Sequence, residues 1–484
     1  MSSEGHHIGR NAIWSILNQS AGQMMVLIVF LVTARFISKE DFGTMAIAML
    51  VVEVMRQFSI ESIGLTLMAK AAPDKKDYNA GFLIIVATSL VSAVVIFLGA
   101  GLLADLLDNQ KLQYALHWVC LIIVTFGASK IHETWLAKNM QFKQLALRSI
   151  FSILIGGSVG IYMAVHGYGL LSLIAQQVIT TLVSTAFLWS VTHWRPGLDT
   201  TKEHVIGILK YARYISFNNS AHLANAQSDV FLAAYFLGPA ATGIYNAAKR
   251  LILSATLVMS SAIGQVSMPA LASASHDLAK LRKTYLDFCL FTCVFTAPAF
   301  AGLASLSVPI VQLLLGSSWS EAAPILSILC LPAFIISIGQ LGDQVLLGMN
   351  KPSITSVFAA LNGISNILLL ILLAKYGLEY IAFSFALKTI LLSPALLYFA
   401  HKPLTISFSD YLKPLSRPLL SSAVMAGVLY FGQTQMSDFH AAVQLFVLIP
   451  SGIIVYFSSL WVFDKELVLS LIKFVRAPRS VQDN

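Results

Sequence analysis

The stretch GFLIIVATSLVSAVVIFLGAGLLA occupies residues 81–104 and contains no charged residue. A helix needs about 20 mostly apolar residues to cross the hydrocarbon core of a membrane, so this stretch predicts a transmembrane helix. Similar runs recur along the chain, separated by charged or Gly/Pro-rich breaks. They predict about fourteen transmembrane helices, at residues 11–36, 43–63, 81–104, 112–135, 148–165, 170–192, 213–237, 243–267, 286–309, 322–347, 354–374, 379–400, 418–433 and 440–463.

The composition supports an all-α polytopic membrane protein. Of the 484 residues, 57% are hydrophobic and only 11% are charged, whereas a soluble protein usually has about 25% charged residues. The mean hydropathy is +0.76. These values exclude a soluble globular protein of this size and make the lipid bilayer the solvent. We therefore expect no nucleic-acid partner, although the net charge is +8.

The distribution of basic residues predicts that both termini lie on the cytoplasmic side. Cytoplasmic loops of membrane proteins are enriched in Lys and Arg. If the N-terminus is inside, most of the 31 basic residues fall in inside segments, and the outside segments hold only Arg35, Lys39, Lys111 and Lys375. A missing or extra helix in the middle of the chain would destroy this pattern.

The connections between the predicted helices are too short for a catalytic domain. The longest inside connection is at about 193–212, and outside connections such as 105–111 and 434–439 are shorter. We find no phosphate loop of the Walker type, no metal-ligand cluster and no nucleophile–base signature. The sequence therefore predicts a non-enzymatic protein with no metal or cofactor.

A weak internal repeat relates segments that lie 200 residues apart. Two pairs of segments align in one register, SILNQSAG at 15–22 with ISFNNSAH at 215–222, and ARFISKEDFGTMAIA at 34–48 with AYFLGPAATGIYNAA at 234–248. The repeat predicts two parallel six-helix lobes, 1–200 and 201–402, followed by two extra helices and a cytoplasmic tail, 403–484. Transporters built from such repeats commonly bind their substrate between the halves, near the membrane midplane.

Ionisable residues inside membrane helices are functional candidates, because each costs about 2.5–3.5 kcal/mol to insert. The candidates are Arg56, Lys249, Arg250 and Lys388, which are basic, and Glu53, Asp229 and Asp343, which are acidic. The basic groups predict a cationic cavity that binds an anion. The acidic groups predict ion coupling or salt bridges.

Three of these assignments leave alternatives open. Glu53 and Arg56 are three residues apart, so they form either a structural ion pair or a functional site. Lys249 and Arg250 point about 100° apart on one helix, so they line a cavity unless one extends to the interface. Asp229 binds a coupling cation or proton, or else pairs with a Lys or Arg.

Polar side chains on the first helices of the two predicted lobes indicate a hydrated cleft. Asn18 and Gln23 lie on helix 11–36, Asn218 and Asn225 lie on helix 213–237, and Tyr245 lies on the next helix. Amide and hydroxyl groups of this kind can hydrogen-bond to sugars.

Two further patterns predict packing rather than substrate binding. Gly156, Gly157 and Gly160 form a small-residue face that suits close contact between helices. Lys130 and Glu133 are three residues apart and suit an ion pair.

Several stretches carry a family resemblance through their order in the chain. They are NAIWSILNQSAGQ and ARFISKEDFG near the start, WRPGL at 194–198, NAQSDVFLAAYFLGPAATGIYNAAKRL at 225–251, VSMPALASASHDLAKLRKTY at 266–285 and LLLGSSWSEAAPIL at 313–326. Together they resemble the polysaccharide transporter family of bacterial oligosaccharide flippases, of the Wzx/WzxC type. That family shares a superfamily with the drug-extruding MATE transporters and the lipid II flippase.

The resemblance implies a MATE-like fold in the bacterial inner membrane, with a cavity that opens alternately to either side. It implies an undecaprenyl-diphosphate-linked oligosaccharide repeat unit as substrate, for exopolysaccharide, capsule or O-antigen biosynthesis. It also implies a downstream polymerase and chain-length regulator as partners, and it is compatible with coupling to a proton or Na⁺ gradient. The cationic residues would then bind the diphosphate.

Two rival functions remain at this stage. A MATE-like cation-coupled drug exporter is the first, but a basic cavity disfavours cationic drugs, and helix 11–36 lacks the acidic residue of many such relatives. An integral-membrane enzyme acting on the same lipid donor is the second. Such an enzyme needs a larger outside loop than this chain offers.

Overall fold

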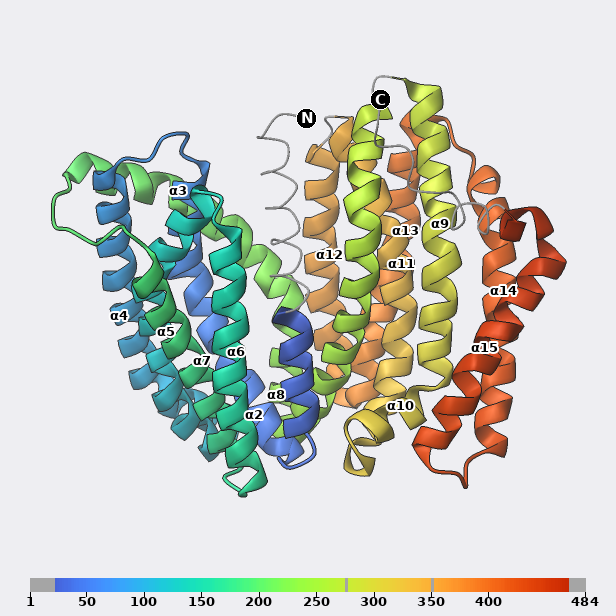
Figure 1. Ribbon diagram of the computed structural model, residues 1–484, viewed down its shortest axis with the longest axis horizontal. Helices are drawn as coiled ribbons and strands as arrows, with labels where there is room; N and C mark the ends of the chain where they lie inside the picture. Colours follow the sequence, from blue (N-terminus) through green and yellow to red (C-terminus); the bar gives the residue numbers. More distant parts are fainter. Residues whose placement is uncertain (1–21, 275–276, 350–351, 470–484) are drawn as a thin grey trace. The chain divides into compact units, whose positions relative to one another are not determined.

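The computed structural model describes residues 22–274, 277–349 and 352–469, and every regular element within them is a helix (Figure 1). A helix bonds its backbone polar groups internally, as the hydrocarbon core of a membrane requires. After a first helix, Gly22–Thr33, the elements are α2 Lys39–Arg56, the π-helix η1 Gln57–Glu61, α3 Ser62–Ala69, α4 Lys75–Leu106, α5 Gln110–Lys138, α6 Phe142–Val165, α7 Leu170–Val191, α8 Lys202–Ala274, α9 Leu278–Ser305, α10 Ser307–Leu314, η2 Ser317–Trp319, α11 Ala322–Gly348, α12 Pro352–Leu373, η3 Ala374–Tyr376, α13 Leu378–Leu404, α14 Phe408–Gln435 and α15 Ala441–Phe463.

Eleven helices in the described ranges are long and apolar enough to cross a membrane. The predicted number of about fourteen is therefore not confirmed, for three reasons. The predicted helix 11–36 begins outside the described residues, and its described part, Gly22–Thr33, is short. The predicted helices 213–237 and 243–267 are replaced by a single candidate membrane span, Asn225–Met259. Helix α14 is not among the eleven candidate spans.

Gly238 interrupts α8 where the sequence predicts a connection between two helices. Its backbone has φ +81° and ψ −178°, which is not helical. Glycine adopts a positive φ without the steric cost that a Cβ atom imposes. Pro239 follows directly, and proline suits the first position of a helix. Helix α8 thus consists of two helical segments that meet at Gly238.

The packed helices form two compact units. The first contains the described residues up to Arg250 together with Gly363–Ile381, and the second contains Leu251–Asn362 and the described residues from Ala382 onward. This division follows packing and not repeat symmetry. The predicted lobes 1–200 and 201–402, with the extra segment 403–484, therefore stay a prediction.

Glycine allows close contact between α6 and α7 in the first unit. A Cβ atom at Gly156 would lie 2.0 Å from Thr180 Oγ1, and one at Gly160 would lie 2.7 Å from Gln176 Cβ. Gly157 packs equally closely against Val29. The predicted small-residue face is confirmed.

A second close contact joins α2 and α8 through a pair of glycines that the repeat aligns. A Cβ atom at Gly43 would lie 1.7 Å from the carbonyl oxygen of Pro239, and one at Gly243 would lie 2.0 Å from that of Lys39. The two contacts are reciprocal, because residues 39 and 43 correspond to 239 and 243 at an offset of 200. Any larger side chain at either glycine would force the two backbones apart.

The second unit packs α9 against α11 and α14, and α14 against α15 (Figure 1). One buried cluster includes Tyr285, Cys289 and Cys293 on α9, together with Leu341 on α11 and Tyr411 on α14. The hydroxyl of Tyr285 lies 3.1 Å from His401 Nε2. These polar groups are bonded within the core of the unit.

Candidate functional site

A pocket in the first unit surrounds the guanidinium group of Arg250. It lies among the helix Gly22–Thr33, α2, α7 and the part of α8 that follows Gly238. Arg250 Nε donates to Asn246 Oδ1 at 3.2 Å, and the guanidinium lies 5.0 Å from the centre of the Phe30 ring. Gln176 and Gln177 add amide groups to the lining. The pocket therefore offers a fixed cation beside hydrogen-bonding and aromatic groups.

The Arg250 pocket is small in this conformation. It encloses about 40 Å³, whereas a single water molecule needs about 10–15 Å³ on the same measure. A few water molecules fit, but a diphosphate group does not. Binding of a larger anion would require the surrounding helices to move apart.

Lys249, the neighbour of Arg250, belongs to a buried ion pair. Its Nζ donates to Asp229 Oδ1 at 2.9 Å and to Oδ2 at 2.8 Å, and it also donates to the carbonyl oxygen of Ala226 at 2.7 Å. Tyr245 Oη donates to Asp229 Oδ2 at 2.7 Å. The side chain of Asp229 is 7% exposed and that of Lys249 is 19% exposed. The sequence leaves open whether Asp229 binds a coupling ion or pairs with a basic residue. In this conformation Asp229 forms a salt bridge with Lys249.

Asn366 on α12 binds the part of α8 that carries Asp229. Asn366 Nδ2 donates to the carbonyl oxygen of Asn225 at 3.1 Å and to Ser228 Oγ at 3.0 Å. The side-chain oxygen of Asn225 is buried without a hydrogen-bond partner among the described residues. The predicted sugar-binding role of Asn225 stays a prediction.

Arg56 belongs to a second group of charges, which spans α2, η1, α5 and α6. Its Nη2 lies 2.8 Å from Glu53, and its Nη1 lies 3.3 Å from Glu61. Lys130 contacts Glu61 at 2.7 Å and Glu133 at 3.7 Å, and Glu133 contacts Arg148 at 3.0 Å. We call these six residues the charge network. Its three acidic and three basic groups balance.

The charge network confirms the two ion pairs that the helical spacing predicts, Glu53–Arg56 and Lys130–Glu133. Helical spacing does not predict the link between the two pairs, because Glu61 and Lys130 are 69 residues apart. Arg56 is engaged by two carboxylates in this conformation. Its predicted role as a diphosphate ligand would require it to leave at least one of them.

The structure places the remaining candidates separately. Lys388 and Asp343 belong to the second unit, where Lys388 is 3% exposed and lies 4.3 Å from the centre of the Phe385 ring. Gln23 is exposed. Asn18 and the side chain of Asn218 lie outside the described residues.

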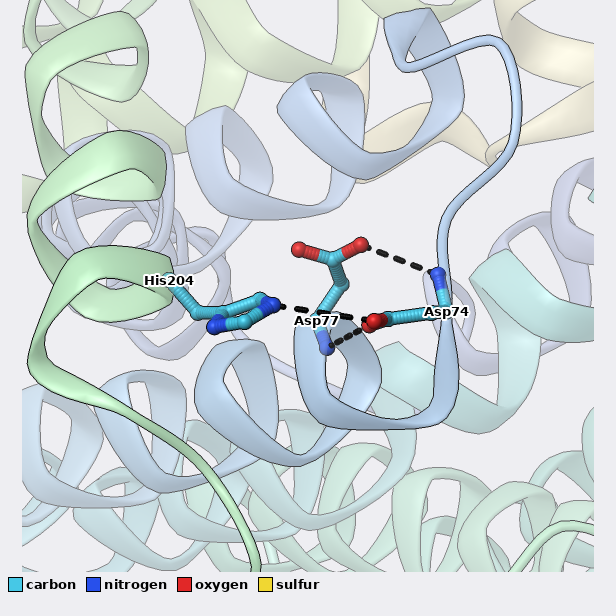
Figure 2. Close-up of side chains that lie close together, drawn as sticks. All are labelled: Asp74, Asp77 and His204. Carbon is cyan, nitrogen blue, oxygen red and sulfur yellow. Dashed lines mark hydrogen bonds and ion pairs between the residues drawn. The ribbon is translucent and has the colours of Figure 1, made fainter.

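Among the described residues, one grouping of potential metal ligands joins the start of α4 to the start of α8. Figure 2 shows His204, at the start of α8, directed at Asp74, which precedes α4. His204 Nε2 lies 3.6 Å from Asp74 Oδ2, and Asp74 and Asp77 cap the start of α4 reciprocally. Lys70 Nζ also binds both oxygens of Asp77, at 2.7 and 2.6 Å. These contacts account for the cluster as a helix cap.

The cap also determines the protonation of Asp74, which lies in the connection before α4. The hydrogen bond from the backbone N–H of Asp77 lowers the pKa of Asp74 below its usual value, with further lowering from the side chain of Asp77 and from His204. The carboxylate is thus held ionised for capping.

Comparisons with known proteins agree with this architecture. Residues 32–324 match the model of a family described as polysaccharide biosynthesis protein. The succinoglycan biosynthesis transport protein ExoT of Rhizobium meliloti (strain 1021) is 26% identical over 330 residues, which cover 68% of this chain and 67% of ExoT. The lipopolysaccharide biosynthesis protein WzxC of Escherichia coli (strain K12) is 22% identical over 337 residues, covering 69% and 68% of the two chains.

Solved structures share the fold at lower sequence identity. The lipid II flippase MurJ, in an inward closed conformation, aligns with a TM-score of 0.75 and 19% identity over 94% of this chain and 100% of that chain. A multidrug resistance MATE family transporter, in an inward-facing conformation, aligns with a TM-score of 0.60 and 12% identity over 81% and 98%. The fold is therefore MATE-like, as the resemblance implies. The chain is a multi-pass membrane protein that belongs to the polysaccharide biosynthesis protein family of transporters and flippases.

Proposed function

We propose that this protein moves an undecaprenyl-diphosphate-linked oligosaccharide repeat unit from the cytoplasmic to the periplasmic leaflet of a bacterial inner membrane. Family membership supports a role in polysaccharide export. The names of ExoT, a transport protein, and MurJ, a lipid flippase, support movement of a lipid-linked glycan. The product would feed a downstream polymerase and its chain-length regulator.

The Arg250 pocket is the single observation that carries the proposal. A guanidinium group presents its N–H donors in a planar fork that matches phosphate oxygens. Asn246, Gln176 and Gln177 stand beside it and supply donors and acceptors for the diphosphate or the first sugar. Arg250 is therefore the residue that we assign to the diphosphate.

The remaining cationic candidates have secondary parts in this proposal. Arg56 and Lys249 are paired with carboxylates in the described conformation, so they would bind substrate only in another state of the transport cycle. Lys388 lies in the second unit. We propose that about fourteen helices, arranged in two lobes with both termini in the cytoplasm, complete the alternating-access machine.

The shared fold keeps a drug exporter as the alternative, since a MATE transporter also aligns. A cationic drug would be repelled by Arg250, whereas the lipid diphosphate would be attracted. Coupling of either activity to a proton or Na⁺ gradient would need a titratable or ion-binding carboxylate. Asp229 would serve only after release from Lys249.

Deletion of the chromosomal copy in the producing strain tests the proposed function. We expect lipid-linked repeat units to accumulate in the inner leaflet, where an added impermeant periplasmic glycosidase cannot reach them. Expression of the wild-type chain should restore access and export, and Arg250→Gln should not. Normal export by the deletion strain, in the absence of a second copy, would refute the proposal.

A further inference from the structure

A second pocket of the first unit lies where the starts of two helices meet a turn. Its lining comes from the start of α2, the start of α5 and the turn between α6 and α7. We call it the tyrosine pocket, and it is lined by Asp41, Lys111, Tyr114, Tyr168, Gly169 and Leu171, among others. It shares no lining residue with the Arg250 pocket. In the predicted orientation, these three segments all face the periplasm.

The tyrosine pocket has the volume of a ligand site. It is a hollow that is open to the surface, with a volume of about 360 Å³, and pockets for small molecules usually measure about 300–1,000 Å³. Gly169 helps to keep it open, because its φ of +52° favours glycine, and a Cβ atom there would lie 3.0 Å from Asp41 Oδ2. Glycine therefore lets the backbone of the turn lie close to the Asp41 carboxylate.

The polar part of the tyrosine pocket is a matched donor and acceptor. Lys111 Nζ donates to Asp41 Oδ1 at 2.8 Å, which holds the carboxylate in place. The side chain of Asp41 is 11% exposed, and that of Lys111 is 56% exposed. Hydroxyl groups both donate and accept hydrogen bonds, so two adjacent hydroxyls can bond to the carboxylate and the ammonium together. The pair is neutral in sum, which favours an uncharged ligand over a phosphate.

The apolar part consists of two tyrosine rings. Tyr114 is 47% exposed and Tyr168 is 56% exposed. Tyrosine rings offer a flat apolar face with a polar edge, which suits the C–H face of a sugar ring. Tyrosines are also common at membrane interfaces. That location alone does not explain a carboxylate that is held by a lysine 70 residues away and lies beside a glycine with positive φ.

We propose that the tyrosine pocket binds a pyranose residue of a glycan on the outer face of the protein. The ring stacks on Tyr168 or Tyr114, and two neighbouring hydroxyls bond to Asp41 and Lys111. Its biological role rests on the proposed function, because the glycan would be the sugar portion of the delivered repeat unit. The pocket would hold these sugars on the side where the lipid-linked unit is released.

The probe for this site is the free oligosaccharide released by mild acid from the lipid-linked material of the deletion strain. Binding to the purified protein in nanodiscs is followed by saturation-transfer NMR. We expect transfer to sugar ring protons with the wild-type chain. Asp41→Asn should weaken binding about tenfold, because it removes a hydrogen bond to a charged group. Tyr168→Ala should weaken binding to a similar extent, because it removes a ring on which the sugar stacks.

Tyr162→Ala is the matched control, because Tyr162 is 63% exposed on α6 and does not line the pocket. Absence of transfer with the wild type, equal weakening by Tyr162→Ala, or full binding by Asp41→Asn would each overturn the proposal. Asp41→Asn is nearly isosteric, so it tests the site even if Tyr168→Ala fails to fold.

Arg250→Gln separates this site from the proposed function. It should lose binding of undecaprenyl diphosphate and keep binding of the free oligosaccharide. A wild-type chain that binds the oligosaccharide but not undecaprenyl diphosphate would sustain the tyrosine pocket and contradict the diphosphate site. The reverse pattern would overturn only the tyrosine pocket.

Discussion

The ion pair between Asp229 and Lys249 makes a sharp prediction about stability. Lys249→Met leaves a carboxylate that is 7% exposed with Tyr245 Oη and the Val230 N–H as its remaining donors. Removing one partner of a buried pair costs about 3–5 kcal/mol. We expect the same range for Asp229→Asn, which leaves the ammonium without its counter-charge.

The double variant tests whether the two charges depend on each other. Asp229→Asn with Lys249→Met removes both, so we expect a free energy of unfolding within about 1–2 kcal/mol of the wild type. The coupling energy should then be about 4 kcal/mol or more. Tyr245→Phe is the control that removes one hydrogen bond to the carboxylate, at about 1.5–3 kcal/mol.

Unfolding in mixed detergent micelles, followed by circular dichroism, measures these free energies, and export measures function in the same variants. If the losses in the free energy of unfolding of the two single variants add in the double variant, the two charges do not stabilise each other and the prediction is refuted. If the double variant is as stable as the wild type but does not export, Lys249 takes part in substrate binding. Export by that double variant would leave Arg250 as the cation that matters.

Two other predictions concern packing and charge balance. Gly43→Ala and Gly243→Ala should each abolish export, because a Cβ atom at either position forces α2 and α8 apart. Gly207→Ala is the control and should leave export normal, because a Cβ atom there meets no atom within 4 Å. Wild-type export by both Gly43→Ala and Gly243→Ala would contradict the close contact. Glu61→Gln should destabilise the chain by about 3 kcal/mol, because it leaves the charge network with excess positive charge. Arg282→Met breaks a more exposed pair with Asp410 and should cost at most about 1 kcal/mol, so equal losses in micelle unfolding would refute the special status of the network.

The sequence predicts local features of this fold well. Apolar runs identify the membrane helices, because the bilayer demands both length and apolarity. Residues three apart on one helix predict the Glu53–Arg56 pair, and small residues on one face predict the contact of α6 with α7. Each of these features depends on residues that are close together in the chain.

Features that depend on the path of the chain were not predictable. The Asp229–Lys249 pair forms because the chain reverses at Gly238, which brings residues 20 apart into contact. Helical spacing alone leaves Lys249 without a partner, so it appeared free to bind an anion. The charge network likewise depends on how α5 packs beside η1.

The tyrosine pocket also depends on the path of the chain. Asp41 lies at the start of α2, Lys111 at the start of α5 and Tyr168 in the turn between α6 and α7, and no spacing pattern joins them. From the sequence alone, Lys111 contributes only to the predicted orientation of the chain in the membrane. Its contact with Asp41 is what gives it a second role.

Translocation in reconstituted vesicles tests the central claim most directly. Vesicles carry the lipid-linked repeat unit with or without the protein, and an impermeant glycosidase reports how much becomes accessible on the outer leaflet. We predict that the wild-type chain raises accessibility beyond the starting half, that Arg250→Gln does not, and that Gly207→Ala does. Wild-type translocation by folded Arg250→Gln, or none by the wild type, would contradict the account.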